Sequence, residues 1–295
     1  MTTLLEKFSA LFEKVSKTLP LSRIIEVSCY IAGAGAFGVF FRWIQDQLAF
    51  DDAGLPESSL LHYLLPLYLV VAALVMRRFI RRYEKEGLAV SDDICTAFAN
   101  DGALYGFLRW AIGLMMTVGG LVTLMTTELD KYGDMLRILA ILAMLSGLAW
   151  ALTLELIRRR SANRGLLCVL MLIPMLLYAF WLIYCYRRNS INGVIWSYVV
   201  EVATVCAALL AFFRAAGYAF DAPNWKRCVF DVSFAAELCL TSLADERYLG
   251  MQLILFATAL MFLLYNWIMV CSLTRTEEKP EEEPAEVSDG GFEKL

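Results

Sequence analysis

Long apolar runs separated by short charged clusters constrain this 295-residue chain more than any other feature. A helix needs about 20 apolar residues to cross a hydrocarbon core of about 30 Å. The runs that reach or approach this length are Ile112–Thr127, Leu136–Leu154, Leu166–Tyr186, Val194–Phe213 and Leu249–Cys271. A helix on the surface of a soluble domain would show a polar face at every turn, and these runs do not. The pattern predicts an all-α fold, a polytopic membrane helix bundle.

We predict about eight transmembrane helices, near residues 23–44, 60–80, 104–127, 134–157, 165–186, 193–213, 226–244 and 248–272. The seventh has the weakest composition, because Asp231 and Glu237 interrupt it. We retain it because eight crossings place most lysines and arginines of the connecting segments on the side of both termini, as the positive-inside rule requires of the cytoplasm. The chain is therefore expected in the inner or plasma membrane, with its N- and C-termini cytoplasmic. A re-entrant helix at 226–244 is the alternative.

Two terminal segments flank the predicted bundle, which covers residues 21–273. Residues 1–20 alternate apolar and charged side chains at helical spacing, which predicts an amphipathic helix on the membrane surface or packed against the protein's own cytoplasmic loops. Residues 274–295 are predicted to be a disordered acidic tail, with nothing to bury. Glu277–Leu295 holds eight acidic residues and two lysines, a net charge of −6.

The segment between the second and third predicted spans is longer than most of the other connections. Ser91 is expected to cap a short helix that runs from Asp92 towards Asn100, because a serine side chain can accept a hydrogen bond from the first turn.

Gly33, Gly35 and Gly38 match the G-x-G-x-x-G pattern of dinucleotide-binding proteins. That pattern needs a preceding strand and a helix start that a phosphate can reach. Here it falls inside the first predicted span. It therefore indicates close packing between helices, since small residues let two backbones approach.

Ionisable residues at membrane depth are the strongest functional signal, because each is costly unless it faces a partner or water. Glu201 lies inside the sixth predicted span and Glu237 near the middle of the seventh. Ser233 and Thr241 share a helical face with Glu237, and Asn266 lies on a polar face of the eighth span. We predict that these five residues line a cavity for a substrate or ion between the last three helices. Interhelical hydrogen bonds, with the acids protonated, are the alternative.

Arg187 and Arg188 form a basic spot in the turn between the fifth and sixth spans, among aromatic residues typical of a membrane interface. They are expected either to receive an anionic solute or lipid headgroup on the outer side, or to anchor the turn.

The sequence offers little support for an enzyme. His62 is the only histidine, which excludes paired-histidine metal and haem sites, and neither a P-loop nor a Gly-x-Ser-x-Gly elbow is present. We therefore predict no catalytic residue, no metal site and no cofactor.

The leading interpretation is a small-solute or ion transporter or permease subunit. The alternative is a non-transporting membrane component, such as a sensor, assembly or immunity protein that acts through its cytoplasmic loops or tail. An intramembrane lipid-modifying enzyme comes last. The expected partners are the lipid bilayer and either a small solute or ion or another protein, and no nucleic acid.

Overall fold

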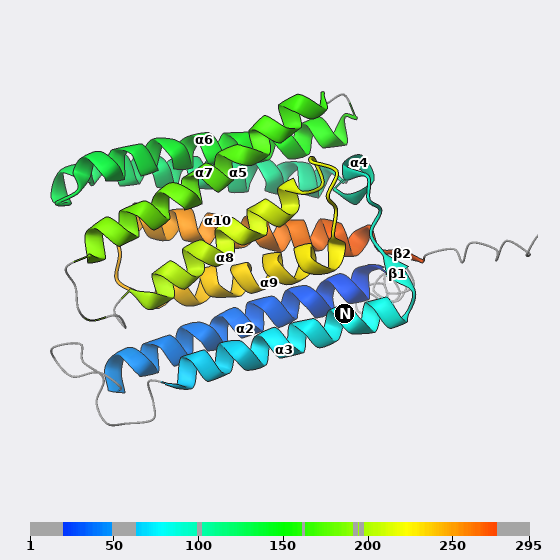
Figure 1. Ribbon diagram of the computed structural model, residues 1–295, viewed down its shortest axis with the longest axis horizontal. Coiled ribbons are helices and arrows are strands. Elements are labelled where there is room, and N and C mark those ends of the chain that lie inside the picture. Colours follow the sequence, from blue (N-terminus) through cyan, green and yellow to red (C-terminus); the bar gives the residue numbers. More distant parts are fainter. Residues whose placement is uncertain are drawn as a thin grey trace, which may run out of the picture.

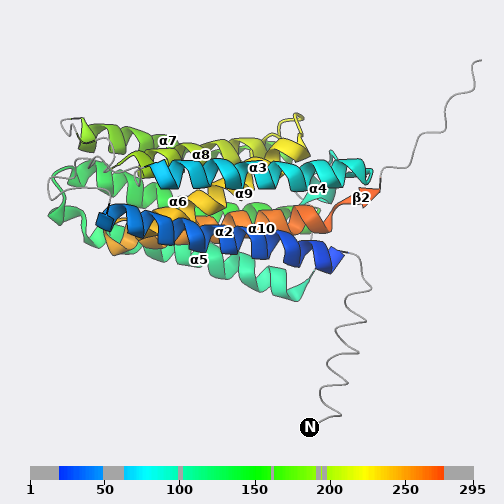
Figure 2. The same ribbon diagram turned by 90° about the horizontal axis from the view of Figure 1, so that it is seen from below.

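The computed structural model describes residues 20–48, 63–98, 102–160, 163–190, 194 and 198–275. Within them lie eight helices of 17 residues or more. Their bounds are α2 (Pro20–Leu48), α3 (Leu64–Lys85), α5 (Ala103–Met125), α6 (Gly133–Arg158), α7 (Arg164–Asn189), α8 (Val199–Ala216), α9 (Trp225–Thr241) and α10 (Leu249–Cys271). They run side by side along one long axis (Figures 1 and 2), and one helix lies at each predicted position. The amphipathic helix and the acidic tail fall outside the described residues, apart from Pro20, which begins α2, and Thr274 and Arg275.

Six of the described helices are long and apolar enough to cross a membrane, namely α2, α5, α6, α7, α8 and α10. The architecture is therefore that of a multi-pass membrane protein. The count of eight is not confirmed. The C-terminal half of α3 carries Arg77, Arg78, Arg81 and Arg82, and α9 has only 17 residues.

Two short strands lie at one end of the bundle (Figure 1). β1 (Leu88–Ala89) pairs antiparallel with β2 (Thr274–Arg275). We call this the β end. The other described short elements are α4 (Ile94–Ala97) and the 3₁₀ turns η2 (Thr127–Leu129) and η4 (Ser242–Ala244).

Asp93, not Ser91, caps α4, which corrects the prediction made from the sequence. The Asp93 carboxylate accepts a hydrogen bond from the backbone N–H of Thr96 at 3.0 Å. Ser91 instead accepts one from the backbone N–H of Asp93 at 3.3 Å. Asp93 takes the role because it is the extended residue directly before the first helical turn.

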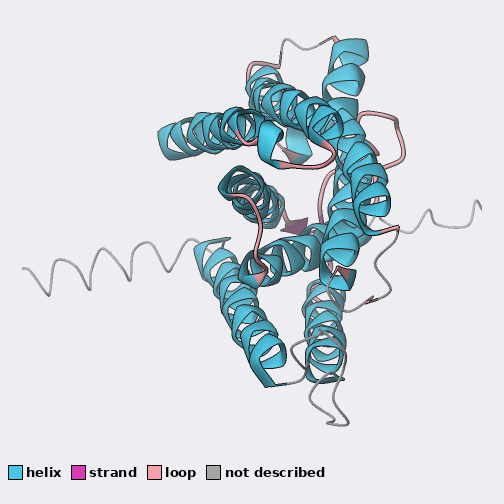
Figure 3. Ribbon diagram, turned by 90° about the vertical axis from the view of Figure 1, so that its left-hand side faces the viewer, coloured by secondary structure: helices cyan, strands magenta, loops and turns pink. Residues whose placement is uncertain are grey.

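Six helices form a closed ring. Each packs on the next in the order α5, α6, α7, α8, α9 and α10, and α10 packs back on α5. α10 is the most buried of the membrane-length helices. α2 lies outside the ring against α9 and α10, and α3 lies against α2 and α9. Figure 3 views this arrangement along the helices, from the end opposite the β pair.

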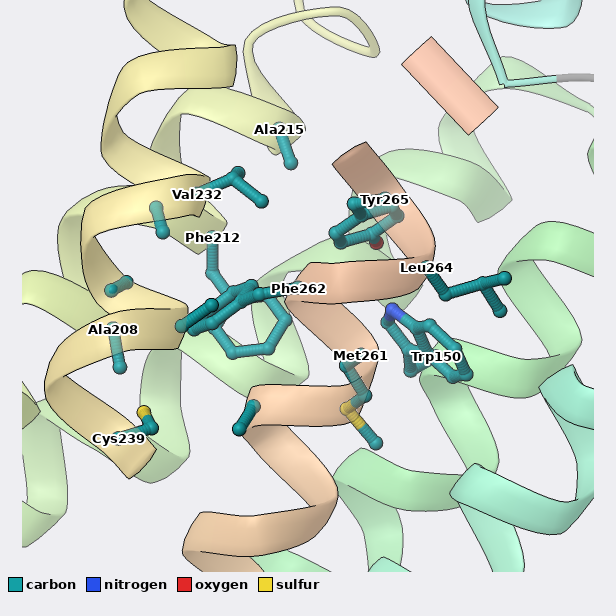
Figure 4. Packing of buried hydrophobic residues seen from close by; sticks show 14 of the residues in the cluster. Trp150, Ala208, Phe212, Ala215, Val232, Cys239, Met261, Phe262, Leu264 and Tyr265 are labelled. Atoms are coloured by element: carbon teal, nitrogen blue, oxygen red, sulfur yellow. The ribbon is translucent and has the colours of Figure 1, made fainter. Parts of the chain in front are cut away.

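Aromatic side chains fill the middle of the ring (Figure 4). The rings of Phe212 on α8 and Phe262 on α10 lie 4.7 Å apart between centroids. Trp150 on α6 and Tyr265 on α10 meet edge to face at 5.8 Å. A void of about 10 Å³ beside these residues has room for about one water molecule. These aromatic side chains thus form a packed core around a void of this size.

Glycines set the closest helix crossings. A Cβ on Gly147 of α6 would lie 2.5 Å from the carbonyl oxygen of Gly113 on α5, and one on Gly113 would lie 2.8 Å from that of Gly147. Within the G-x-G-x-x-G stretch, Gly35 and Gly38 pack against Leu240 and Thr241 of α9. Two of the three glycines therefore serve the close packing that the sequence indicates.

We expect Gly147→Ala to lower stability by roughly 1–3 kcal/mol, because the added methyl group meets a backbone oxygen that cannot rotate away. Thermal unfolding of the purified protein in one detergent measures this. Gly33→Ala is the matched control, since a Cβ there meets nothing within 4 Å, and alanine favours a helix over glycine. Equal unfolding midpoints for the two variants would contradict the crossing geometry.

Candidate functional site

A polar stripe runs along the buried side of α9. Ser233, Glu237 and Thr241 follow one another at intervals of four residues, and all three are buried. The two hydroxyls use the helix's own backbone: Ser233 Oγ donates to the Val229 carbonyl at 2.6 Å and Thr241 Oγ1 to the Glu237 carbonyl at 2.9 Å. Thr241 also faces Gly38 of α2. The stripe therefore lies at the contact between α9 and α2.

Asn266 of α10 joins the stripe at Ser233. Its Oδ1 lies 3.2 Å from Ser233 Oγ, whereas its Nδ2 is buried with no hydrogen-bond partner among the described residues. The single hydroxyl hydrogen of Ser233 can serve either the Val229 carbonyl or Asn266, but not both. An unsatisfied hydrogen-bonding capacity therefore remains between α9 and α10.

Two tyrosines tie α2 to α3 beside Glu237. Tyr30 of α2 donates to the Ala72 carbonyl of α3 at 2.6 Å, and Tyr68 of α3 donates to the Ala34 carbonyl of α2 at 2.6 Å. Both phenol groups lie within electrostatic range of Glu237, and that of Tyr68 lies within hydrogen-bonding reach. The carboxyl group thus lies where α9 meets the α2–α3 pair.

Backbone carbonyls compete with Glu237 for the hydrogens of these tyrosines. Each phenol has one hydrogen, and in Tyr30 and Tyr68 it is already given to a backbone carbonyl. Towards Glu237 their oxygens can only accept. While Tyr68 keeps its bond to the Ala34 carbonyl, a hydrogen bond between Glu237 and Tyr68 requires a proton on the carboxyl group.

No described arginine or lysine forms an ion pair with Glu237. Its Oε1 is buried without a hydrogen-bond partner in the described part of the chain. A buried polar atom left unsatisfied costs about 1–3 kcal/mol, and more if it is charged. Packing alone does not account for Glu237.

Glu201 belongs to a different group. It lies in the first turn of α8, where its Oε1 accepts a hydrogen bond from Trp181 Nε1 at 3.0 Å and lies 3.7 Å from Arg247 Nε. The structure therefore brings Ser233, Glu237 and Asn266 together with Thr241 along α9 and α10, but separates Glu201 from them. The reason is direction: Glu201 faces α7 and the segment before α10, whereas Glu237 faces α2 and α3.

Arg247 extends this second group into a balanced ionic network at the end of the bundle opposite the β pair. Its Nη2 donates to Asp245 Oδ2 at 2.7 Å, and Arg42 Nε donates to Asp245 Oδ1 at 2.7 Å. Arg42 also donates to Gln45 at 2.9 Å. Two cations, Arg42 and Arg247, face two anions, Asp245 and Glu201, and all four side chains are no more than 12% exposed. This network joins α2, α8 and the start of α10.

Arg187 and Arg188 lie exposed in the last turn of α7. Asp130 and Glu201 are within electrostatic range of Arg188. Nearby acids therefore offset part of the positive charge of this predicted outer basic spot.

Among the residues that the structure describes, no group of three or more His, Cys, Asp or Glu could hold a metal ion. Comparison of the chain with protein-family models, with curated proteins and with solved structures found no match.

Sequence reasoning missed Tyr30, Tyr68, Asp245 and Arg247. Tyr30 looked like an ordinary residue of an apolar span and Tyr68 like an aromatic residue at a membrane interface. Nothing in their spacing links them to a glutamate far along the chain. Asp245 and Arg247 lie in a short connection, where charged residues are expected without a partner. The packing of α2 and α3 against α9 brings the tyrosines to Glu237, and the connection before α10 brings Arg247 to Glu201.

Asp245→Asn should destabilise the protein by about 3–5 kcal/mol, because it leaves two buried arginines facing each other without their shared carboxylate. Asp134→Asn is the control: Asp134 is 97% exposed and pairs with Arg137 at 3.5 Å, so its loss should cost no more than about 1 kcal/mol. Unfolding midpoints in detergent compare the two. Adding Arg42→Gln to Asp245→Asn should recover part of the loss, and full additivity would argue against the network.

Proposed function

We propose that this chain is a small-solute or ion transporter, or a permease subunit, that carries a proton or a small monovalent cation past Glu237. The observation that supports this most strongly is the Glu237 carboxyl group itself. It is buried within the helix bundle, faces oxygen acceptors, and forms no ion pair with a described cation. Intramembrane acids of this kind commonly mark proton or ion pathways.

The proposal includes eight crossings, with α3 and α9 as the two beyond the six. α9 is surrounded by α2, α8 and α10, so it need not be apolar on every side. Its 17 residues span about 26 Å, and η4 extends it. α3 exposes Leu67, Val70 and Leu74, as a lipid-facing helix would.

We place both termini in the cytoplasm and the protein in the inner or plasma membrane. The β end carries most of the basic residues in the described connections and helix ends. They include Arg77 to Lys85, Arg158 to Arg160, Arg164, Arg214, Lys226 and Arg227. The positive-inside rule makes this the cytoplasmic side.

The packing of the α2–α3 pair suggests how Glu237 would be reached. α3 contacts the other long helices mainly through α2 and α9, and α2 lies outside the six-helix ring. A displacement of the pair from α9 would open the Arg42–Asp245 ion pair and expose Glu237, while leaving the contacts within the ring intact. Movement of one helix group against another around a buried site is a common mode of transport.

Glu237→Gln tests the proposal directly. The protein is reconstituted into liposomes that contain a pH-sensitive dye, a pH gradient is imposed, and Na⁺ or K⁺ is supplied outside. We expect these liposomes to dissipate the pH gradient faster than protein-free liposomes do. Glu237→Gln should abolish this flux, because glutamine cannot bind and release a proton. The variant should still fold, since glutamine has nearly the shape of a protonated glutamate.

Asp134→Asn, which neutralises an exposed acid, is the matched control and should keep full flux. A wild-type protein no faster than empty liposomes with either cation would overturn the proton or cation assignment. Flux that persists in Glu237→Gln would remove Glu237 from the pathway.

The second candidate is a non-transporting membrane component that acts through its cytoplasmic loops or tail. The packed ring favours it, because neither the void of about 10 Å³ nor the surface hollow found along α3 is lined by Glu237. Deletion of Glu277–Leu295 separates the two functions. A transporter should keep its ion flux, whereas a component that works through the tail should lose its partner in crosslinking from intact membranes.

A further inference from the structure

The exposed surface of α3 changes abruptly from apolar to basic. Val71, Leu74 and Val75 are exposed, and the next turns expose Arg77, Arg78 and Arg81. These six side chains line one open hollow along the helix, together with Phe79, Arg82, Glu84, Lys85 and Glu86. Its two glutamates are already paired, Glu84 with Lys226 and Glu86 with Arg23 and Arg82. A single surface therefore offers apolar contact at one end and positive charge at the other.

These three arginines differ from their neighbour Arg82. Arg82 donates to Glu26 at 3.2 Å and to Glu86 at 3.2 Å. By contrast, Arg77, Arg78 and Arg81 form no ion pair with a described residue. Their guanidinium groups are thus available to an anion from outside the described part of the chain.

We propose that this hollow binds one anionic phospholipid from the surrounding bilayer. The phosphate group contacts Arg77, Arg78 and Arg81, and an acyl chain lies along Val71, Leu74 and Val75. Arginine suits this role because its planar guanidinium group donates two parallel hydrogen bonds to phosphate. The proposal rests on the membrane crossing of α3 and does not depend on transport at Glu237.

The dimensions fit a lipid better than a free anion. From Val71 to Arg81 the helix rises about 15 Å, enough for a headgroup and the upper part of an acyl chain. A soluble phosphate would use the basic half and leave the apolar half bare. Basic residues at the cytoplasmic end of a membrane helix also meet the leaflet in which anionic lipids are enriched.

The acidic tail is the competing occupant. β2 pairs with β1 so that Arg275 lies opposite Leu88, only three residues after the end of α3. Arg275, the last described residue before the acidic segment Glu277–Leu295 of net charge −6, therefore lies near the basic end of α3. The composition of this segment complements the basic half of the hollow but supplies few apolar side chains for the other half, so we favour the lipid.

Native mass spectrometry of the full-length protein in detergent tests the proposal, with phosphatidylglycerol and phosphatidylcholine of equal chain length as probes. We expect one phosphatidylglycerol to bind in preference to phosphatidylcholine. Arg77→Gln, Arg78→Gln and Arg81→Gln combined should weaken its binding by at least roughly tenfold. Lys131→Gln with Arg137→Gln, two exposed cations at the opposite end of the bundle, should leave binding unchanged.

Two further experiments distinguish a lipid headgroup from a free phosphate as the bound anion. Glycerol phosphate, which has the phosphate group but no acyl chain, should not displace the bound lipid. The double variant Leu74→Ser with Val75→Ser should weaken the binding of phosphatidylglycerol. The Glu237→Gln variant should bind phosphatidylglycerol as the wild type does. A failure of the lipid-binding proposal can therefore be told apart from a failure of the transport proposal.

Equal binding of the two lipids by the wild type would overturn the proposal. So would a triple variant that keeps the preference, or displacement by glycerol phosphate. A preference that appears only after deletion of Glu277–Leu295 would show instead that the tail occupies this surface.

Discussion

The burial of α9 among α2, α8 and α10 is the interaction on which the rest of the structure depends. α9 carries Ser233, Glu237 and Thr241 along one side, and hydrocarbon cannot accept such a stripe. Neighbouring helices must therefore cover it. α10 covers the Ser233 end of the stripe through Asn266, and α2 covers the Thr241 end at Gly38. The approach of α2 is close because Gly35 and Gly38 leave room for α9 side chains, so the position of the α2–α3 pair follows from the polarity of α9.

Most polar side chains in the bundle need no cavity, because the helix backbone satisfies them. Thr117, Thr123, Thr153, Thr204 and Thr258 each donate to the carbonyl four residues earlier. These bonds let hydroxyl groups lie among apolar neighbours at little cost. A carboxylate has no hydrogen to donate to a backbone carbonyl, and it loses more hydration energy on burial than a hydroxyl group does. Glu237 therefore differs from the buried threonines in the chemistry of its side chain rather than in how deeply it is buried.

The positions of the helices could be predicted from the sequence because each apolar run is bounded by charged or turn-forming residues. Hydropathy alone does not identify α3 and α9 as membrane-spanning helices. α3 ends in exposed arginines, and α9 is covered by protein rather than by lipid, so neither needs to be apolar throughout. Side-chain partners were harder to predict. Glu201 and Glu237 looked equivalent as acids within spans, but the rotation of α8 and α9 in the bundle sends them to different neighbours. Rotation depends on packing, which one sequence does not specify.

The two groups of buried acids differ in charge balance, and the proposed function rests on this difference. Asp245 and Glu201 face Arg42 and Arg247, so their burial is compensated and their role is to join helix ends. Such a network would lose stability if any member changed its charge. Glu237 has no such cationic partner within the described residues, and it lies between the six-helix ring and the α2–α3 pair packed outside it. A group that gains or loses a proton must be able to change charge without unfolding its surroundings. In the proposed transporter, Glu237 would meet that requirement through a movement of the α2–α3 pair away from α9 while the ring stays closed.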